Sequence, residues 1–255
     1  DVPGQGGASW AVLQYVLGLR RLGHEGVLIE PVRSLERSAG YFRRIAESFA
    51  LDAILLERES GRRIEVTRRR PDGADLLLNL SGVLSETVDA DLSVYVDLDP
   101  GFTQAWHTHG IDMGFDRHDR FVTVGRSIGQ TTCPIPHCDR SWLTIPQPII
   151  LEHWPYASLV RHRAATSVGH WRSYGSLVHD GIHYGQRAHA TRELIRLPEL
   201  SQVRVLLALG IDPAEQDDLA ALRRHKWELT DPVQVASTPT AYRSFIQGSL
   251  LELGI

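Results

Sequence analysis

The stretch Gly4-Gln5-Gly6-Gly7-Ala8-Ser9 opens a pattern that indicates an α/β fold. Apolar residues follow this glycine turn at helical spacing, namely Ala8, Ala11, Val12, Tyr15, Val16 and Leu19. The helix is expected to end at Gly23, because glycine readily adopts the conformation that closes a helix. Val27-Leu28-Ile29 is then a short apolar run of the kind that forms a buried parallel strand. A glycine turn, an amphipathic helix and a buried strand in this order favour a parallel sheet covered by helices.

The same alternation continues along the chain. We expect a helix over 34–50 and strands at 53–56, 64–66, 76–80, 93–96 and 121–124. Five prolines then interrupt residues 129–156, which we interpret as an extended segment crossing between two domains. Beyond it we expect strands near 167–168, 203–209 and 227–229, and helices over 187–197, 212–225 and 239–253. Pro213 and Pro239 each suit the first position of a helix.

This pattern predicts two Rossmann-like domains, one over residues 1–150 and a partial one over residues 151–255. The second α/β unit is short for a complete domain of this type. The chain begins with Asp1 rather than Met, and Gly254 resembles a helix cap. We therefore expect a piece of a longer protein that is truncated at both ends.

The composition excludes several classes of protein. Hydrophobic residues make up 42% of the chain and charged residues 23%, as in an ordinary globular protein. A net charge of −4 gives no electrostatic reason to expect a nucleic-acid partner. No apolar run approaches the roughly 20 residues of a membrane span, and no signal peptide is evident. Two cysteines are too few for a disulfide framework, so the cytoplasm is the predicted location.

The glycine turn is the first candidate site. Glycines allow a ligand to approach the backbone closely, and the helix that follows presents free N–H groups to an anion such as a diphosphate. The spacing is not the full dinucleotide fingerprint, because Ser9 and Trp10 stand where a third glycine is wanted. A tight turn without a ligand is an equally good interpretation.

Two carboxylates leave the predicted strand at 93–96. Asp97 and Asp99 precede Pro100, which forces Asp99 out of the helical region. Asp99 would then lie at the tip of the strand, where a general base for a sugar hydroxyl could act. The alternative is that Asp99 is only the N-cap of the next helix.

The segment Trp106-His107-Thr108-His109-Gly110 holds further proton-transfer groups. His107 and His109 could contact an acceptor or assist proton transfer, they could bind a metal together with nearby carboxylates, or they could lie in a polar loop. The group Cys133-Pro134-Ile135-Pro136-His137-Cys138 offers only part of a zinc site, because no second cysteine pair exists. We therefore expect no metal.

The last candidate is His170-Trp171-Arg172-Ser173-Tyr174-Gly175-Ser176, which follows the first strand of the second half. An arginine can grip a phosphate with two parallel hydrogen bonds, and aromatic side chains can stack on a flat base. An interdomain loop whose aromatic residues pack the hinge is the alternative.

Taken in order, these segments resemble uncharacterised bacterial glycosyltransferases of the GT-B fold, and the likeness runs through nearly the whole chain. The resemblance implies two Rossmann-like domains facing across a cleft. It implies that the N-terminal domain holds the acceptor and that the C-terminal domain holds a nucleotide-sugar donor. It implies no metal and no cofactor, since helix dipoles and basic side chains offset the diphosphate charge.

The resemblance also carries roles to individual residues. Catalytic or acceptor-side positions would be Asp99, His107 and His109. Donor-binding positions would be Gly6, Gly7, Arg172, Tyr174 and Gly175. The donor's ribose and diphosphate are usually gripped in this fold by a later strand-helix segment, which this chain lacks, so we expect reduced or no activity from the fragment.

The leading hypothesis is therefore transfer of a sugar from a nucleotide sugar to an unidentified acceptor. One alternative is a non-catalytic, two-domain protein that binds a small ligand. A second alternative is a nucleotide-sugar epimerase of the GT-B type. The donor sugar, its nucleotide, the acceptor and the stereochemistry of transfer are not indicated by the sequence.

Overall fold

The computed structural model describes residues 3–66, 73–86 and 88–254. The chain divides into two compact units: the first contains Tyr15–Ile149, and the second contains the described residues 3–14 and 150–254. The boundary between the two units in the middle of the chain lies between Ile149 and Ile150. The sequence analysis placed residues 3–14 in the N-terminal domain, whereas in the structure they belong to the second unit. Helix α1 (Gly6–Arg21) consequently contributes to both units.

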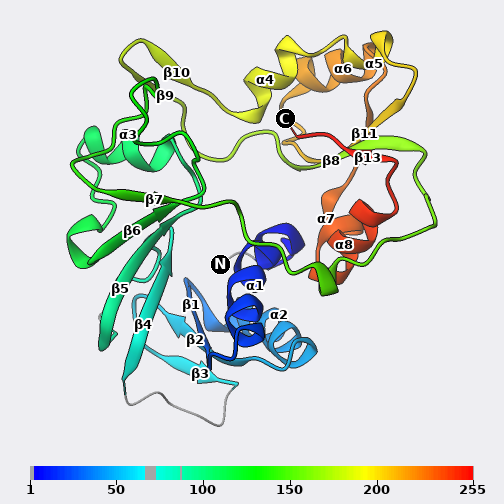
Figure 1. The fold of residues 1–255 in the computed structure, drawn as a ribbon. Helices are drawn as coiled ribbons and strands as arrows, with labels where there is room; N and C mark the ends of the chain where they lie inside the picture. The colour runs from blue at the N-terminus through cyan, green and yellow to red at the C-terminus, as the bar shows by residue number, and fades with distance from the viewer. Residues whose placement is uncertain (1–2, 67–72, 87, 255) are drawn as a thin grey trace. The chain divides into compact units, whose positions relative to one another are not determined.

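The first unit contains two sheets rather than the single sheet expected (Figure 1). In one of them, β1 (Val27–Val32) and β2 (Asp52–Glu57) run parallel, joined by helix α2 (Leu35–Ser48). Strand β3 (Arg63–Glu65) turns back through Gly61, whose φ is +66°, and pairs antiparallel with β2. This return strand ends the parallel pattern at β2.

The second sheet of the first unit is wholly parallel. It contains, in spatial order, β4 (Ala74–Leu80), β5 (Ala90–Asp97), β6 (Arg120–Thr123) and β7 (Trp142–Thr144). Helix α3 (Phe102–Thr108) and the 3₁₀ turn η1 (Phe115–Arg117) lie between β5 and β6 in the chain. Tyr95, Phe115 and Phe121 form an aromatic core with Trp142 packed against it. The proline-rich crossing thus contributes a strand at its centre because Trp142 completes this core.

The second unit is built on one parallel sheet and a separate hairpin. The sheet has the spatial order β12 (Glu228–Thr230), β11 (Arg204–Gly210), β8 (Ala164–His170) and β13 (Leu251–Glu252). Its helices are α4 (Arg187–Glu193), α5 (Leu197–Leu200), α6 (Gln216–Arg224), α7 (Pro232–Ala236) and α8 (Pro239–Gln247). The hairpin is β9 (Leu177–His179) with β10 (Ile182–Tyr184), and a 3₁₀ turn, η2, spans Leu151–His153. The α/β class with parallel sheets is confirmed.

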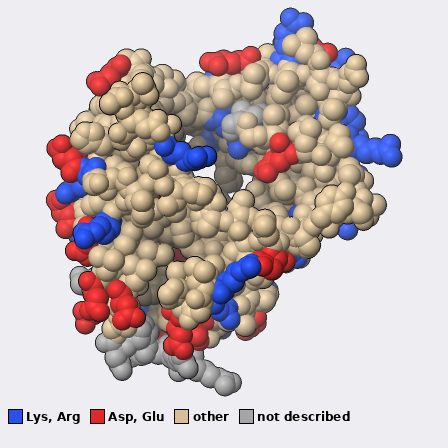
Figure 2. Space-filling view, viewed as in Figure 1, with Lys and Arg blue, Asp and Glu red and all other residues tan. Residues whose placement is uncertain are grey.

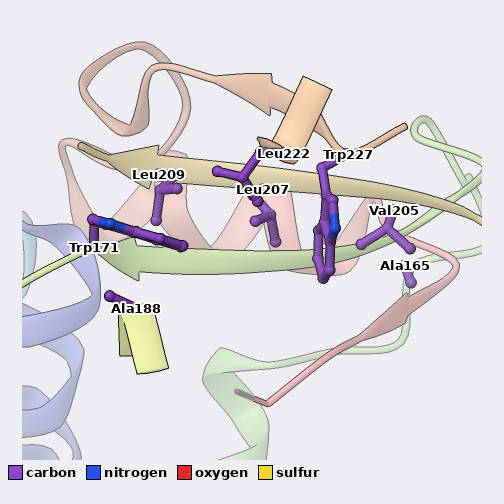
Figure 3. Close-up of a cluster of buried hydrophobic side chains, with 8 residues drawn as sticks. All are labelled: Ala165, Trp171, Ala188, Val205, Leu207, Leu209, Leu222 and Trp227. Atoms are coloured by element: carbon purple, nitrogen blue, oxygen red, sulfur yellow. The ribbon is translucent and has the colours of Figure 1, made fainter. Parts of the chain in front are cut away.

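The core of the second unit lies along β8 and β11 (Figure 3). Trp171 is only 1% exposed and Trp227 only 3% exposed. The indole N–H of Trp171 donates to the Asp218 carboxylate at 2.7 Å. The indole N–H of Trp227 donates to the Ile195 carbonyl at 2.7 Å. The complete cluster contains Ala165, Trp171, Ala188, Val205, Leu207, Leu209, Leu222 and Trp227. Trp171 is therefore a core residue, and its ring face is not open for stacking on a ligand.

Three expected elements of the second unit are wrong in detail. The helix expected from Pro213 begins at Gln216, because Asp212 accepts the Ala214 N–H at 2.8 Å and holds a turn there. The helix expected to reach Leu253 ends at Gln247, and the chain then pairs with β8 as β13. Gly254 accordingly follows a strand and caps no helix. The helix over 187–197 is interrupted after Glu193 and resumes as α5.

Candidate functional site

The strand order of the second unit indicates where in its sheet a ligand would bind. The chain passes from β8 to its neighbour β11 and then to β12, and returns to the other side of β8 as β13. In open parallel sheets, ligands bind at the carboxyl ends of the two strands between which the direction of winding reverses. The candidate site of this unit therefore lies at the carboxyl ends of β8 and β13, near His170 and Glu252.

An arginine occupies this position. Arg187, the first residue of α4, donates from Nη1 to the Ser167 hydroxyl at 2.8 Å and from Nη2 to the Val168 carbonyl at 3.3 Å. In the part of the chain that the structure describes, its guanidinium forms no ion pair with a carboxylate. Burial lowers the pKa of Arg187 from its ordinary value, and the nearby Tyr242 and Glu252 oppose that shift. A partly buried cation without a paired anion is costly, which favours an anionic ligand at this place.

Gly169 lets the guanidinium lie against the sheet. A Cβ atom at Gly169 would come within 2.6 Å of Arg187 Nη2, so a larger residue would displace the charged group. Gly210, at the end of the neighbouring strand, packs similarly under His170, with 2.8 Å between a Cβ atom there and His170 Nδ1. The two strand ends are thus shaped to hold Arg187 and His170 in place.

The glycine turn lies at the carboxyl end of β8, within the second unit. Gln5 Nε2 is 3.1 Å from His170 Nε2, which joins the start of α1 to the end of β8. In the described part of the chain, the first-turn N–H groups of Gly6, Gly7 and Ala8 have no backbone acceptor. A helix of 16 residues directs the positive end of its dipole to this point. The start of α1 and Arg187 therefore supply two sources of positive potential within one unit.

Gly6 and Gly7 also have a packing role. A Cβ atom on Gly6 would overlap the Thr238 carbonyl oxygen and lie 2.7 Å from that of Ala236. A Cβ atom on Gly7 would lie 2.9 Å from the ring of Tyr242. Close packing on the junction of α7 and α8 therefore explains both glycines without a ligand. Their predicted contact with a donor stays a prediction.

The other predicted donor-binding residues lie further along the same loop. Arg172 is bound by both carboxylate oxygens of Glu215, one of them 3.2 Å from Nη2, and it lies 3.9 Å from the carboxylate of Asp218. Hydrogen bonding to Glu215 raises the pKa of Arg172. Because this charge is already neutralised, Arg172 is less suited than Arg187 to hold a phosphate. Tyr174 is 44% exposed, and a side chain at Gly175 would meet open space.

The predicted catalytic residues belong to the first unit. Asp97, at the end of β5, is completely buried, and its carboxylate accepts from Gln104 Nε2 at 2.8 Å, Thr123 Oγ1 at 2.7 Å and the Asp99 N–H at 3.0 Å. These bonds tie α3 and β6 to the end of β5. Asp97 is therefore a structural carboxylate, and Asp99 beside it is the more accessible of the two.

Asp99 is not the N-cap that one interpretation expected. Helix α3 begins after Gly101, whose φ of 97° excludes most other residues, and the Gly101 N–H donates to Gln104 Oε1 at 2.7 Å. The role of Asp99 as a general base stays a prediction. The carbonyl of Asp99 accepts the Thr103 N–H at 3.1 Å.

His107 and His109 do not form a pair. They are two positions apart at the end of α3, so they face different sides of the helix. The ring of His107 packs on Phe115 at 4.4 Å, and its Nδ1 is buried without a hydrogen bond from any residue that the structure describes. His109 is exposed at the C-cap.

The metal-binding alternatives find no geometric support. Among the described residues, no group of three or more His, Cys, Asp or Glu side chains is placed to hold a metal ion. Burial raises the pKa of the Cys138 thiol, which donates to the Gln104 carbonyl at 3.3 Å. A protonated thiol in this position supports the end of α3.

Tyr15 is a candidate that the sequence did not reveal. Its position in the apolar stripe of α1 suggested a core residue. Burial, with the nearby Asp97 carboxylate, raises the pKa of Tyr15 to about 12, so the phenol stays protonated. Its hydroxyl is buried and makes no hydrogen bond within the described residues. The only sequence signal would have been a polar atom within an apolar stripe.

Comparison of the chain with family models, curated proteins and solved structures gives no significant match. No helix in the described ranges is long and apolar enough to cross a bilayer. Both signs of charge occur on the face shown in Figure 2, and uncharged residues cover most of it.

Proposed function

We propose that this chain is a metal-independent glycosyltransferase of the GT-B type, whose second unit binds the diphosphate of a nucleotide sugar. The observation that carries the proposal is Arg187, a partly buried cation without a carboxylate partner among the described residues, at the carboxyl end of β8. The start of α1 is joined to the same strand end by Gln5 and His170. Together they suit a ligand with more than one negative charge.

The transfer itself would use the groups of the first unit. In the proposed reaction, the acceptor hydroxyl oxygen bonds to the anomeric carbon as the bond from that carbon to the diphosphate oxygen breaks. The hydroxyl proton passes to Asp99, and the nucleoside diphosphate leaves with the bonding electron pair. His107 and His109 are proposed to contact the acceptor.

Titration calorimetry with UDP-, GDP- and dTDP-sugars tests the proposal. At least one should bind the 255-residue chain, and Arg187→Gln should weaken that binding by about 10-fold or more, because a charge-assisted hydrogen bond contributes roughly 1.5–3 kcal/mol. Arg172→Gln is the matched control, since Glu215 already neutralises Arg172. Binding of none of the sugars would overturn the proposal. Equal binding by the wild type and Arg187→Gln would show that Arg187 does not hold the ligand.

A non-catalytic ligand-binding protein is the second candidate. It is favoured by the first unit, in which Asp97, the best-placed carboxylate, is fully occupied by hydrogen bonds. Binding of a nucleotide sugar without release of nucleoside diphosphate, with or without added acceptors, would support it. Release of the diphosphate without any acceptor would instead favour an epimerase. We also propose a cytoplasmic location and no nucleic-acid partner, as the composition indicates.

A further inference from the structure

The strands of the second unit begin on the side of the sheet opposite the candidate site. Strands β8, β11, β12 and β13 are all parallel, so their amino ends lie together. Figure 3 shows β8 and β11 starting on the side of Ala165 and Val205, away from Trp171. We call the surface formed by three segments that lead into the strands the amino-end surface: residues 156–163, 200–204 and 223–226.

Direct contacts join these segments. In the register of the sheet, Arg204 of β11 pairs with Ala164 of β8, and Arg204 Nε donates to the Glu228 carboxylate of β12 at 2.7 Å. His225 Nδ1 lies 3.0 Å from Glu199 Oε1, which ties the end of α6 to α5. Neighbouring strands are about 4.8 Å apart, so the three strand starts fall within about 10 Å of one another. The segments therefore form one continuous surface.

Five cations on the amino-end surface have no bound anion. Their side chains are exposed and form no ion pair or hydrogen bond with any residue that the structure describes: Arg161, Arg163, Arg223, Arg224 and Lys226. Two carboxylates beside them are already neutralised, Glu199 by Arg196 and His225, and Glu228 by Arg204. Charges within a Debye length of about 10 Å reinforce one another. This surface is therefore positive, although the whole chain has a net charge of −4.

Helix dipoles offset only a small part of this charge. Arg223 and Arg224 lie in the last turn of α6. The N–H groups of Arg161 and His162 donate at 2.7 and 2.9 Å to the carbonyl of Gly248, the C-cap of α8. Each helix end carries roughly half a negative charge, so the two ends together balance about one of the five cations. The remaining cations call for an external anion.

Apolar side chains are exposed among these cations. Tyr156 is 93% exposed and Leu159 64% exposed on the segment that leads through Arg161 and Arg163 into β8, and Leu200, before β11, is 77% exposed. Single exposed leucines are common on proteins, but here they accompany unpaired cations. The surface of a bilayer accommodates this mixture, because leucine and tyrosine enter the interfacial region while arginine and lysine meet anionic headgroups.

We propose that the amino-end surface docks the protein on the anionic surface of a lipid bilayer. The carboxyl ends of the strands then point away from the lipid, and Arg187 stays accessible to a ligand from water. A nucleic acid would pair with the cations but would leave Leu159 and Leu200 in water, so it matches only half of the surface. The inference does not depend on which ligand Arg187 holds.

Sedimentation of the 255-residue chain with lipid vesicles tests the inference. Vesicles of phosphatidylcholine containing about 30% phosphatidylserine should bind the chain at least 10-fold more tightly than vesicles of phosphatidylcholine alone. Raising the salt concentration from about 0.1 M to about 0.5 M should weaken this binding, because salt screens the cations. Binding to neither kind of vesicle, or equal binding to both, would overturn the inference.

Two double variants test the charges. Arg161→Gln with Arg163→Gln should weaken binding to the anionic vesicles by about 30-fold, since each cation near an anionic surface contributes about 5-fold. Arg37→Gln with Arg44→Gln is the matched control: it removes two exposed arginines of α2, in the first unit, and should leave binding unchanged. Equal losses would assign the binding to the charge of the whole chain and contradict the proposed surface.

Two leucine variants test the apolar contribution, since Leu159 and Leu143 are each 64% exposed. Leu159→Ser should weaken vesicle binding by about 5-fold or more, and Leu143→Ser, on β7 of the first unit, should not. Equal effects of the two substitutions would contradict the inference.

A DNA duplex is the competing probe. Duplex binding that is lost with Arg161→Gln and Arg163→Gln, in a chain that binds no vesicle, would assign the surface to a nucleic acid and overturn the inference. Thermal melts check that every variant is folded.

Discussion

The indole N–H of Trp10 donates a hydrogen bond of 2.7 Å to the carbonyl oxygen of Pro239, which joins α1 to the first residue of α8. Trp10 is 3% exposed, and its ring also packs on that of Trp154 at 5.0 Å. This contact is the clearest reason why residues 3–14 belong to the second unit.

Trp10→Phe should therefore destabilise the second unit. The substitution keeps an aromatic ring but leaves the buried Pro239 carbonyl without its donor, and we expect a loss of about 1–3 kcal/mol in the free energy of unfolding. Urea unfolding followed by circular dichroism measures it. The nearby Tyr242→Phe, which alters a ring that also packs on Trp154, serves as a comparison. An unchanged urea midpoint for Trp10→Phe would contradict the packing described for α1.

Gly6→Ala should cost about 1–3 kcal/mol by overpacking, because the added methyl group would overlap the Thr238 carbonyl oxygen, which belongs to the backbone and cannot rotate away. Gly175→Ala is the matched control, since a methyl group there meets open space. We expect a lower melting temperature for the first variant only. Similar melting temperatures for the two variants would show that the start of α1 is not packed as closely as the structure has it.

Asp97→Asn should destabilise the first unit by about 1–3 kcal/mol. Three donors converge on the buried carboxylate, and an amide can accept at only one of its two positions, so at least one donor loses its acceptor or meets an N–H group. Asp116→Asn removes an exposed carboxylate that pairs with Arg140 and should cost less than about 1 kcal/mol. Chemical denaturation of both variants checks the difference. Equal losses would mean that Asp97 does not hold α3 to β5.

Glu57 should make the stability of the first unit sensitive to acid. Its carboxylate accepts from Ser60, from the Leu35 N–H at 3.1 Å and from Arg62 Nε at 2.9 Å. Hydrogen bonding, chiefly from Ser60, lowers the pKa of Glu57 from 4.5 to about 2. Because the folded-state pKa is the lower one, this stabilisation is complete above pH 4.5 and is lost as the pH falls toward 2.

The wild-type chain should thus lose more stability between pH 5 and pH 2.5 than Glu57→Gln, which carries no titratable group at this position. Urea midpoints at the two pH values measure the difference. Parallel loss in both proteins would assign the acid sensitivity to other carboxylates, such as Glu36, which shares Arg62.

Local signals predicted much of the fold. Gly23 follows α1 with a φ of +90°, and its N–H donates to the Arg20 carbonyl as a glycine cap requires. Pro239 begins α8 after Thr238, whose hydroxyl accepts the Ala241 N–H at 3.1 Å. In both places the determining contacts lie within a few residues, so the sequence alone is informative.

Long-range contacts account for what was missed. Leu250 and Leu253 continue the apolar spacing of α8, yet their N–H groups donate to the Ala164 and Thr166 carbonyls of β8, and the chain becomes a strand. The candidate site shows the same limit. Arg172 stood out because it lies beside aromatic residues, whereas the significance of Arg187 depends on Ser167 and Val168 of a distant strand.

The placement of residues 3–14 has a consequence for synthesis on the ribosome. Thr238 and Pro239, on which Gly6 and Trp10 pack, are made more than two hundred residues after this segment. At about 5–20 residues per second, the wait is roughly 10–50 seconds. During that time the indole N–H of Trp10 lacks its acceptor, the Pro239 carbonyl, and a nascent-chain chaperone would find an aromatic side chain whose packing is incomplete.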